Sequence, residues 1–153
     1  MTILKWALAL AVGGFLLFMG ALKFSGAAHI FPFIEYKASA AGLPLAGLAY
    51  PLGNWATGAL EVAAGLLVIL PMTRDIGSKI AVLPFLGAVV FHLSPVLGVV
   101  TPDAYSDPKP VTALANGGPF TAADFSSAES NMLFMMAAGG LIAALINLWV
   151  QRR

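Results

Sequence analysis

Residues 55–70, WATGALEVAAGLLVIL, form an apolar stretch whose only charged residue is Glu61. A spanning helix needs about 20 mostly apolar residues, because the hydrocarbon core of a bilayer is about 30 Å thick and a helix rises about 1.5 Å per residue. Three further stretches meet this requirement with it, at about residues 3–22, 80–100 and 131–150. All four are predicted to be helices, since lipid offers the backbone no hydrogen-bond partners and the alternation of a β-barrel strand is absent.

The composition predicts the same class of protein. Of the 153 residues, 59% are hydrophobic and 10% are charged, and the mean hydropathy is +0.89. A soluble domain has roughly 45–50% apolar and 25% charged residues. The four apolar stretches leave no room for a separate soluble domain, so residues 1–153 are predicted to form one all-α integral membrane domain, a four-transmembrane-helix bundle.

Charge and cysteine content exclude several functions. The net charge is +1, and the only run of basic residues is the terminal pair Arg152–Arg153, so no nucleic-acid partner is expected. The chain has no cysteine, which excludes disulfides, thiol redox chemistry and cysteine-ligated metals. The first stretch resembles a signal peptide, with Lys5 before an apolar run and small residues at 25–28. This run is long for a signal peptide, and we expect it to be retained as a span.

The positive-inside rule sets the expected orientation. With the N-terminus in the cytoplasm, five Lys and Arg residues fall inside and three fall outside. The inner set is Lys5, Arg74, Lys79, Arg152 and Arg153, and the outer set is Lys23, Lys37 and Lys109. Both termini are therefore predicted to be cytoplasmic, in a bacterial or archaeal plasma membrane.

The connections differ in length and character. Residues 23–54 include an aromatic segment from Ile30 to Ile34, which predicts a short interfacial helix or a re-entrant cap. Residues 101–128 are rich in Pro and Gly and are predicted to form a loop with little regular structure. Residues 71–75, PMTRD, predict a tight turn that makes the second and third spans antiparallel.

Two ionisable residues lie within the predicted spans. A carboxylate such as Glu61 is costly there unless it is protonated, paired or facing water, and Gly58 and Gly65 share its helix face. We therefore expect this face to pack inward. Counting from span ends at Asn54 and Val100 places Glu61 about 10 Å and His92 about 12 Å below the outer surface. Equal depth does not fix helix rotation, so contact between these side chains is left open.

Polar residues gather in the outer half of all four spans, whereas the inner half offers only Asn147. This asymmetry predicts a polar pocket that opens outward, with Phe24 and Tyr36 as lids. The predicted ligand-binding residues are Lys23, Glu61, His92, Glu129 and Asn131.

A structural interpretation of the same residues stays open. A pair of Lys23 with Glu61, or of Glu61 with His92, is equally typical of a lock between helices and of a ligand site. Lys23 and Glu129 are also typical of charges that extend to the membrane surface. No metal site is expected, because Glu61, His92 and Glu129 would supply only one nitrogen ligand.

Short motifs within residues 5–150 resemble the DoxX-like family of small four-helix membrane proteins. They are GALKF at 20–24, LEVAAGLL at 60–67, Arg74 in the inner turn, Phe91–His92 and Glu129. The resemblance implies a four-helix bundle in which Lys23, Glu61, His92 and Glu129 form a shared polar site. Some relatives are subunits of quinone-linked sulfur-compound oxidoreductases and others resemble assembly factors of membrane complexes. The loop at 101–128 is larger than the usual family pattern.

These observations support two functional hypotheses. In the first, the pocket holds a quinone or a similar amphipathic molecule, whose head group is bound by His92, Lys23 and Glu61. The chain would then need a partner subunit of a membrane redox system, because it has no cysteine, haem-type His pair or nucleotide motif. In the second, the chain is an accessory or assembly protein that contacts lipid and a partner membrane protein, and its polar cluster is structural. A transporter ranks lower, because no inverted repeat is present.

Overall fold

The structure is a computed structural model that describes residues 2–25, 30–103 and 119–153. The described chain is mostly helical, and four of its helices are long and apolar enough to cross a membrane. They are α1 (Thr2–Phe24), α3 (Asn54–Ile69), α4 (Arg74–Leu93) and α6 (Met132–Gln151). The prediction of a membrane-embedded, helical protein with four candidate spans is confirmed, and the second candidate span extends back to Ala46.

The shorter elements lie in the connections. They are α2 (Ile30–Ala40), the helical turns η1 (Ala46–Leu48), η2 (Ala49–Gly53) and η3 (Ala122–Asp124), and the strands β1 (Thr101–Pro102) and β2 (Glu129–Ser130). The segment from Ile30 to Ile34 is helical, as expected. The strands pair antiparallel, with Thr101 opposite Ser130, and so join the two ends of the predicted loop at 101–128. Residues 104–118 of that loop lie outside the described residues.

The third span was predicted at 80–100, and this was wrong, because α4 covers Arg74–Leu93. The helix stops early because Ser94 precedes Pro95 and adopts an extended backbone, which a following proline favours. It starts early because Arg74, although charged, is buried and hydrogen-bonded within the protein. The depth of His92 was calculated from a helix end at Val100 and is therefore also wrong. His92 lies in the last turn of α4.

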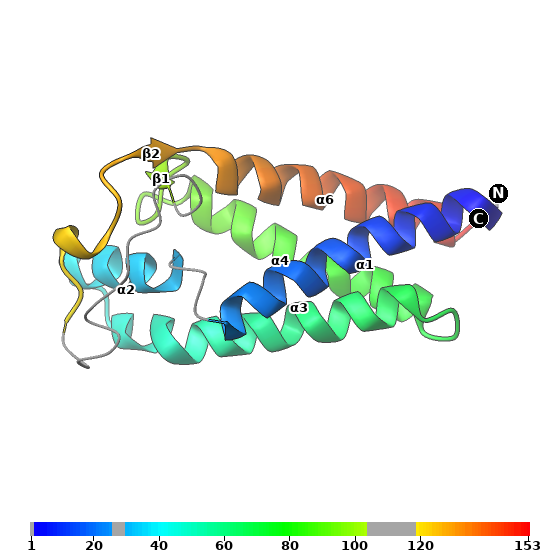
Figure 1. Cartoon of the computed structure of the whole chain (residues 1–153), viewed down its shortest axis with the longest axis horizontal. Coiled ribbons are helices and arrows are strands. Elements are labelled where there is room, and N and C mark those ends of the chain that lie inside the picture. Colours follow the sequence, from blue (N-terminus) through cyan, green and yellow to red (C-terminus); the bar gives the residue numbers. More distant parts are fainter. Residues whose placement is uncertain (1, 26–29, 104–118) are drawn as a thin grey trace.

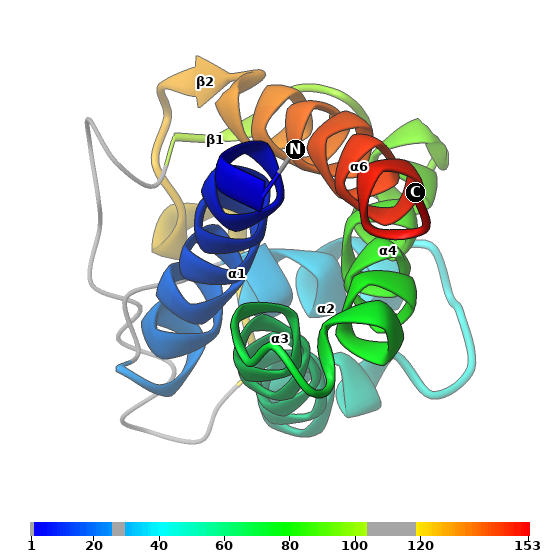
Figure 2. The ribbon, with the colours of Figure 1, turned by 90° about the vertical axis from the view of Figure 1, so that its right-hand side faces the viewer.

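The four long helices lie side by side, with both chain termini at one end (Figure 1). Viewed along the axis, α1 lies beside α3 and α6, and α4 completes the arrangement between α3 and α6 (Figure 2). Residues 70–73 join α3 and α4 as an antiparallel hairpin, in agreement with the predicted tight turn. We call the end opposite the termini the distal end; α2 lies there, over the centre of the helices.

Glycines allow α1 and α3 to approach closely. A Cβ added at Gly65 would lie 2.8 Å from the carbonyl oxygen of Gly13, and one added at Gly20 would lie 3.0 Å from that of Gly58. Gly13 and Gly20 are about two helical turns apart on α1, and so are Gly58 and Gly65 on α3. The two glycines of each helix therefore share one face of that helix. The expected inward packing of Gly58, Glu61 and Gly65 is confirmed, because all three are buried.

At the end that holds the termini, Arg74 joins three segments. Its Nε and Nη2 donate hydrogen bonds to the carbonyl oxygens of Val68 and Ile69, at 3.2 and 3.0 Å. Carbonyl groups at the C-terminal end of a helix such as α3 have no hydrogen-bond donor within the helix itself. Its guanidinium carbon lies 3.9 Å from the centre of the Trp6 ring of α1. Arg74 therefore links α4 to both α3 and α1.

Asn147 forms a second link at this end. Its Nδ2 donates to Ser78 Oγ of α4 at 2.8 Å, and its Oδ1 accepts from Gln151 Nε2 at 3.0 Å. Gln151 also donates to the carbonyl oxygen of Lys5. Asn147 and Ser78 have no exposed surface, and their hydrogen bonds satisfy the polar groups that burial removes from water.

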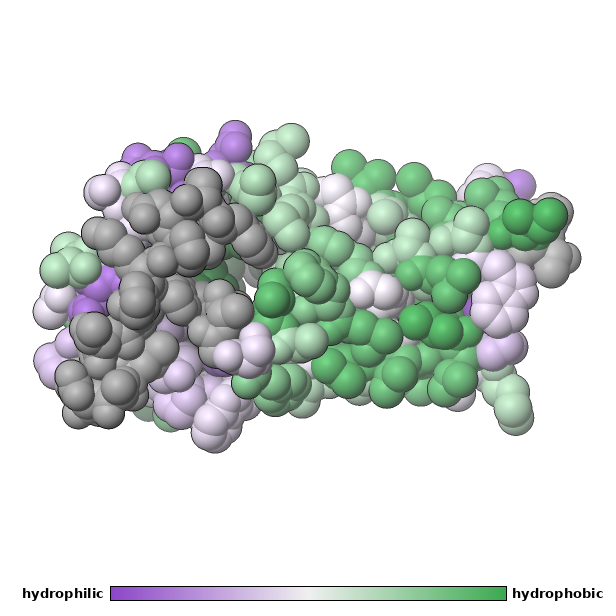
Figure 3. Space-filling view, in the orientation of Figure 1, coloured by the Kyte–Doolittle hydropathy of each residue, from purple (hydrophilic) through white to green (hydrophobic). Residues whose placement is uncertain are grey.

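On the face seen in Figure 3, the middle of the molecule is largely apolar, and polar residues lie toward its two ends. Large side chains such as Leu10, Phe18, Leu66 and Ile142 are about half exposed. The buried core uses smaller residues, including Ala9, Ala64, Ala81 and Ala144. This distribution fits a protein whose surroundings are lipid, where large apolar side chains outside cost nothing and small ones inside let helices pack closely.

Candidate functional site

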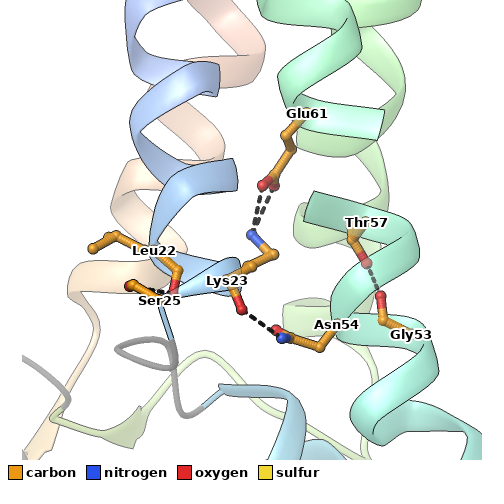
Figure 4. Close-up of polar contacts among 7 residues, drawn as sticks. All are labelled: Leu22, Lys23, Ser25, Gly53, Asn54, Thr57 and Glu61. Carbon is orange, nitrogen blue, oxygen red and sulfur yellow. Dashed lines mark hydrogen bonds and ion pairs between the residues drawn. The ribbon is translucent and has the colours of Figure 1, made fainter. Parts of the chain in front are cut away.

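Lys23 and Glu61 form a buried ion pair near the distal end (Figure 4). Lys23 Nζ donates to both carboxylate oxygens of Glu61, at 2.9 and 2.7 Å. The two residues are 6% and 8% exposed, so water does not screen the pair. The expected need of Glu61 for a partner is met by Lys23.

The backbone around the pair explains how the long lysine side chain reaches α3. Gly58 lies one turn before Glu61, and a Cβ placed on it would be 3.1 Å from the Cβ of Lys23. Asn54 Nδ2 donates to the carbonyl oxygen of Lys23 at 2.9 Å, which satisfies a carbonyl at the end of α1 (Figure 4). From α2, the ring centre of Phe31 lies 5.9 Å from Lys23 Nζ. The lysine head, carried by α1, thus contacts Glu61 of α3 and lies near Phe31 of α2.

His92 is buried at the end of α4 and is oriented by the chain that follows. Its Nδ1 lies 2.9 Å from the carbonyl oxygen of Gly98, which can only accept, so Nδ1 carries the hydrogen. Gly98 has a φ of 82°, a conformation that favours glycine and turns the chain back toward the helix. The ring also makes a T-shaped contact with the ring of Phe134, with centres 6.0 Å apart. In the neutral ring, Nε2 is left as a hydrogen-bond acceptor.

A cavity of about 800 Å³ at the distal end contains Lys23, Glu61 and His92 in its lining. Most of the remaining lining is apolar and comes from α1, α2, α3, α4, α6 and the segment at 43–49. Representative apolar residues are Met19, Phe31, Phe85, Leu133 and Met136. Such a cavity, apolar with a few polar groups that converge, is the usual form of a small-molecule site.

The predicted site residues are only partly brought together. Lys23, Glu61 and His92 line the same cavity, and within the described residues no hydrogen bond joins Glu61 to His92. Glu129 is exposed in β2, and Asn131 is exposed directly before α6; neither lines the cavity.

The two predicted lids, Phe24 and Tyr36, also lie outside the lining. Phe24 covers Gly58 from the side, and Tyr36 packs on Phe125, with ring centres 5.7 Å apart. Phe125 also meets Phe33 edge-on at 5.1 Å. These aromatic contacts fasten the segment that precedes α6 onto α2, so they hold the distal end together instead of covering the cavity.

Sequence reasoning missed the apolar part of the site. Leu43, Leu45 and Leu48 line the cavity from a connection that was treated only as a loop or cap. The signal was present as a row of leucines in a segment between two spans. Thr57 and Asn54 were also overlooked, because each lies in or beside the second span and carries no charge. Within the described residues, no group of three His, Cys, Asp or Glu side chains is arranged to hold a metal ion.

Fold and site together define a membrane-embedded helical protein with a buried ion pair and a buried histidine around one largely apolar cavity. No family model, curated protein or solved structure matches this chain. The resemblance to the DoxX-like family therefore stays a prediction carried by the short motifs alone. What the protein does has to be argued from the chemistry of the cavity.

Proposed function

We propose that this chain is a four-helix membrane bundle with both termini in the cytoplasm of a bacterium or archaeon, and that its distal cavity binds a quinone or a similar amphipathic molecule. The observation that carries the proposal is that His92 and the Lys23–Glu61 pair line one largely apolar cavity. In this orientation the cavity lies in the outer half of the membrane. The protein would act as a subunit of a DoxX-like membrane redox system, with a partner subunit supplying or taking the electrons.

The polar groups suit the two forms of a quinone. An ammonium group has three hydrogens, and two of those on Lys23 are directed at Glu61, so one N–H is left to donate to a quinone carbonyl. His92 Nε2 is an acceptor and can receive the O–H of the reduced form. The apolar lining supplies the surface that a ring and tail require.

A second function, as an accessory protein of a membrane complex, is favoured by a different observation. The Lys23–Glu61 pair satisfies both carboxylate oxygens, and Asn54 adds a further bond to the backbone of Lys23. Together they join α1 to α3 as a structural lock would. Under this interpretation the cluster stabilises the fold, and partner binding takes place on the outer helix faces.

Native mass spectrometry with extraction and identification of bound molecules tests the two functions. We compare the wild type with His92→Phe, which keeps an aromatic ring beside Phe134 but removes both ring nitrogens. Asp75→Asn is the matched control, because Asp75 pairs with Lys79 on the exposed surface at the other end. We expect a bound amphipathic molecule in the wild type and in the control, and its loss from His92→Phe.

Glu61→Gln is compared with the wild type at equal amounts of folded protein, because loss of the buried ion pair also lowers stability. Under the binding proposal, this variant and His92→Phe both lose the bound molecule. Recovery of an empty wild-type chain with a co-purified membrane protein would overturn the binding proposal, and a fall in complex yield for Glu61→Gln would then support the accessory function.

A further inference from the structure

The distal cavity reaches the outer surface of the helices on the side of α3 and α4. On α4, Leu83, Gly87 and Val90 line the cavity and are also exposed. Their spacing of three and four residues places them on one stripe of the helix. Buried residues such as Phe85 and His92 lie on another face, toward the core. The α4 stripe is therefore one edge of an opening in the side of the molecule.

The opposite edge is formed by α3 and by the chain that precedes it. Leu60 of α3 lines the cavity and is 36% exposed. Leu43, Leu45 and Leu48 line it as well and are still more exposed. Leu45 has a φ of 66°, a left-handed conformation that is unfavourable for a leucine and turns this segment sharply. Both edges of the opening thus consist of apolar side chains within candidate spanning segments or beside them.

Gly87 keeps the α4 edge open. A Cβ added at this glycine would have no atom within 4 Å, unlike those at Gly65, Gly77 and Gly140, where close packing explains the glycine. Gly139 in α6 is equally open and exposed, but it does not line the cavity. A larger side chain at 87 would therefore narrow the opening without a clash, whereas the same change at 139 would extend into the surroundings.

We propose that the cavity opens sideways into the lipid between the outer halves of α3 and α4, below residues 43–49. The ligand is then a membrane-resident molecule with a hydrocarbon tail, which lies in this side opening while its polar head reaches His92 and the Lys23–Glu61 pair. This inference rests on the proposed function, because it specifies the ligand class of the same cavity. An apolar opening at membrane depth suits a tail, since the tail passes from lipid to protein without contacting water.

The test uses two probes that share one head group, a dimethoxybenzoquinone with a decyl tail and the same quinone with a methyl group instead. Saturable binding of each radiolabelled probe is measured in proteoliposomes and corrected for partition into protein-free vesicles. Gly87→Trp is compared with Gly139→Trp. We expect Gly87→Trp to weaken binding of the decyl probe by about tenfold or more, because a bulky ring displaces the tail from its opening. Binding of the methyl probe should stay unchanged, and Gly139→Trp should behave as the wild type with both.

Each other outcome counts against a defined part of the proposal. If Gly87→Trp binds the decyl probe as tightly as the wild type does, the proposed side opening is wrong, whereas the proposed function is not affected. Equal loss of both probes would also overturn it, because position 87 would then act on the head group. If the wild type binds neither probe saturably, the proposed quinone function is overturned together with this inference.

Discussion

Lys23 Nζ lies within 2.9 Å of both carboxylate oxygens of Glu61, although the two residues are 38 positions apart in the chain. Each lies on one of the two helices that glycines bring into close contact. The pair is thus both the strongest polar link between α1 and α3 and the charged part of the distal cavity. Its contribution to the free energy of unfolding can be measured separately from that of an ion pair on the surface.

Removing one member of this pair leaves the other buried and uncompensated. We expect Glu61→Gln to lower the free energy of unfolding by about 3–5 kcal/mol. The double variant Lys23→Met/Glu61→Gln should recover most of this loss, because no charge stays buried. The Asp75–Lys79 pair is about half exposed, and we expect Asp75→Asn to cost less than about 1 kcal/mol. Denaturant unfolding in detergent gives the stability of the wild type and of the three variants. Equal losses of stability in Glu61→Gln and Asp75→Asn would contradict this account.

The contact of α1 with α3 predicts a second effect. Gly65→Ala places a methyl group 2.8 Å from the carbonyl oxygen of Gly13 and should destabilise the protein by about 1–3 kcal/mol. Gly14→Ala is the control on the partner helix α1, because a Cβ added at Gly14 meets nothing within 4 Å. We expect this control to be neutral or more stable by up to about 1 kcal/mol, since alanine favours a helix over glycine. A melting temperature that falls equally in both variants would show that helix contact is not the cause.

Arg74 should not tolerate lysine. Lysine lacks the planar fork that reaches the carbonyl oxygens of Val68 and Ile69 while stacking on Trp6. We expect Arg74→Lys to cost about 1–3 kcal/mol. Arg153 also lies 3.9 Å above a tryptophan ring, that of Trp149, but it is exposed, and Arg153→Lys should change stability by no more than about 0.5 kcal/mol. Thermal unfolding of the two variants compares the sites directly, and similar losses would argue against a special role for Arg74.

The proposed orientation can be tested because the chain has no cysteine of its own. Met72, in the turn between α3 and α4, is 99% exposed, and Ala123 in η3 is exposed at the distal end. We expect a membrane-impermeant thiol reagent to label Ala123→Cys in intact cells, and to label Met72→Cys only after permeabilisation. The reverse pattern would place the termini outside and the cavity in the inner half of the membrane.

The sequence predicted the helices well where apolar length alone sets them, and less well where local contacts do. The predicted ends of the first, second and fourth spans agree with the helices to within about two residues. The third span was misplaced because hydropathy counts Arg74 against a helix and Pro95–Val100 in favour of one. Burial of the arginine against α3 and the backbone preference before Pro95 decide otherwise.

The site was predictable to the extent that isolated polar residues stand out in apolar stretches. Glu61 and His92 were identified in this way, and both line the cavity with Lys23. Glu129 and Asn131 were included because they begin the fourth span, but sequence position alone does not show which way a side chain at a helix end points. The leucines at 43–49 were overlooked, since only the folded chain brings this segment to the same cavity as residues of α3 and α4.

The sequence by itself determined that this protein is embedded in a membrane through four apolar helices, because hydrophobic length is a local property of each segment. Only the tertiary structure decided that Lys23 pairs with Glu61, that Gly98 orients His92, and that an apolar cavity joins them. These relationships depend on how each helix is rotated about its axis and on where the connections return to the helices. Packing between residues distant in sequence sets both, so neither can be derived from the hydropathy of a single segment.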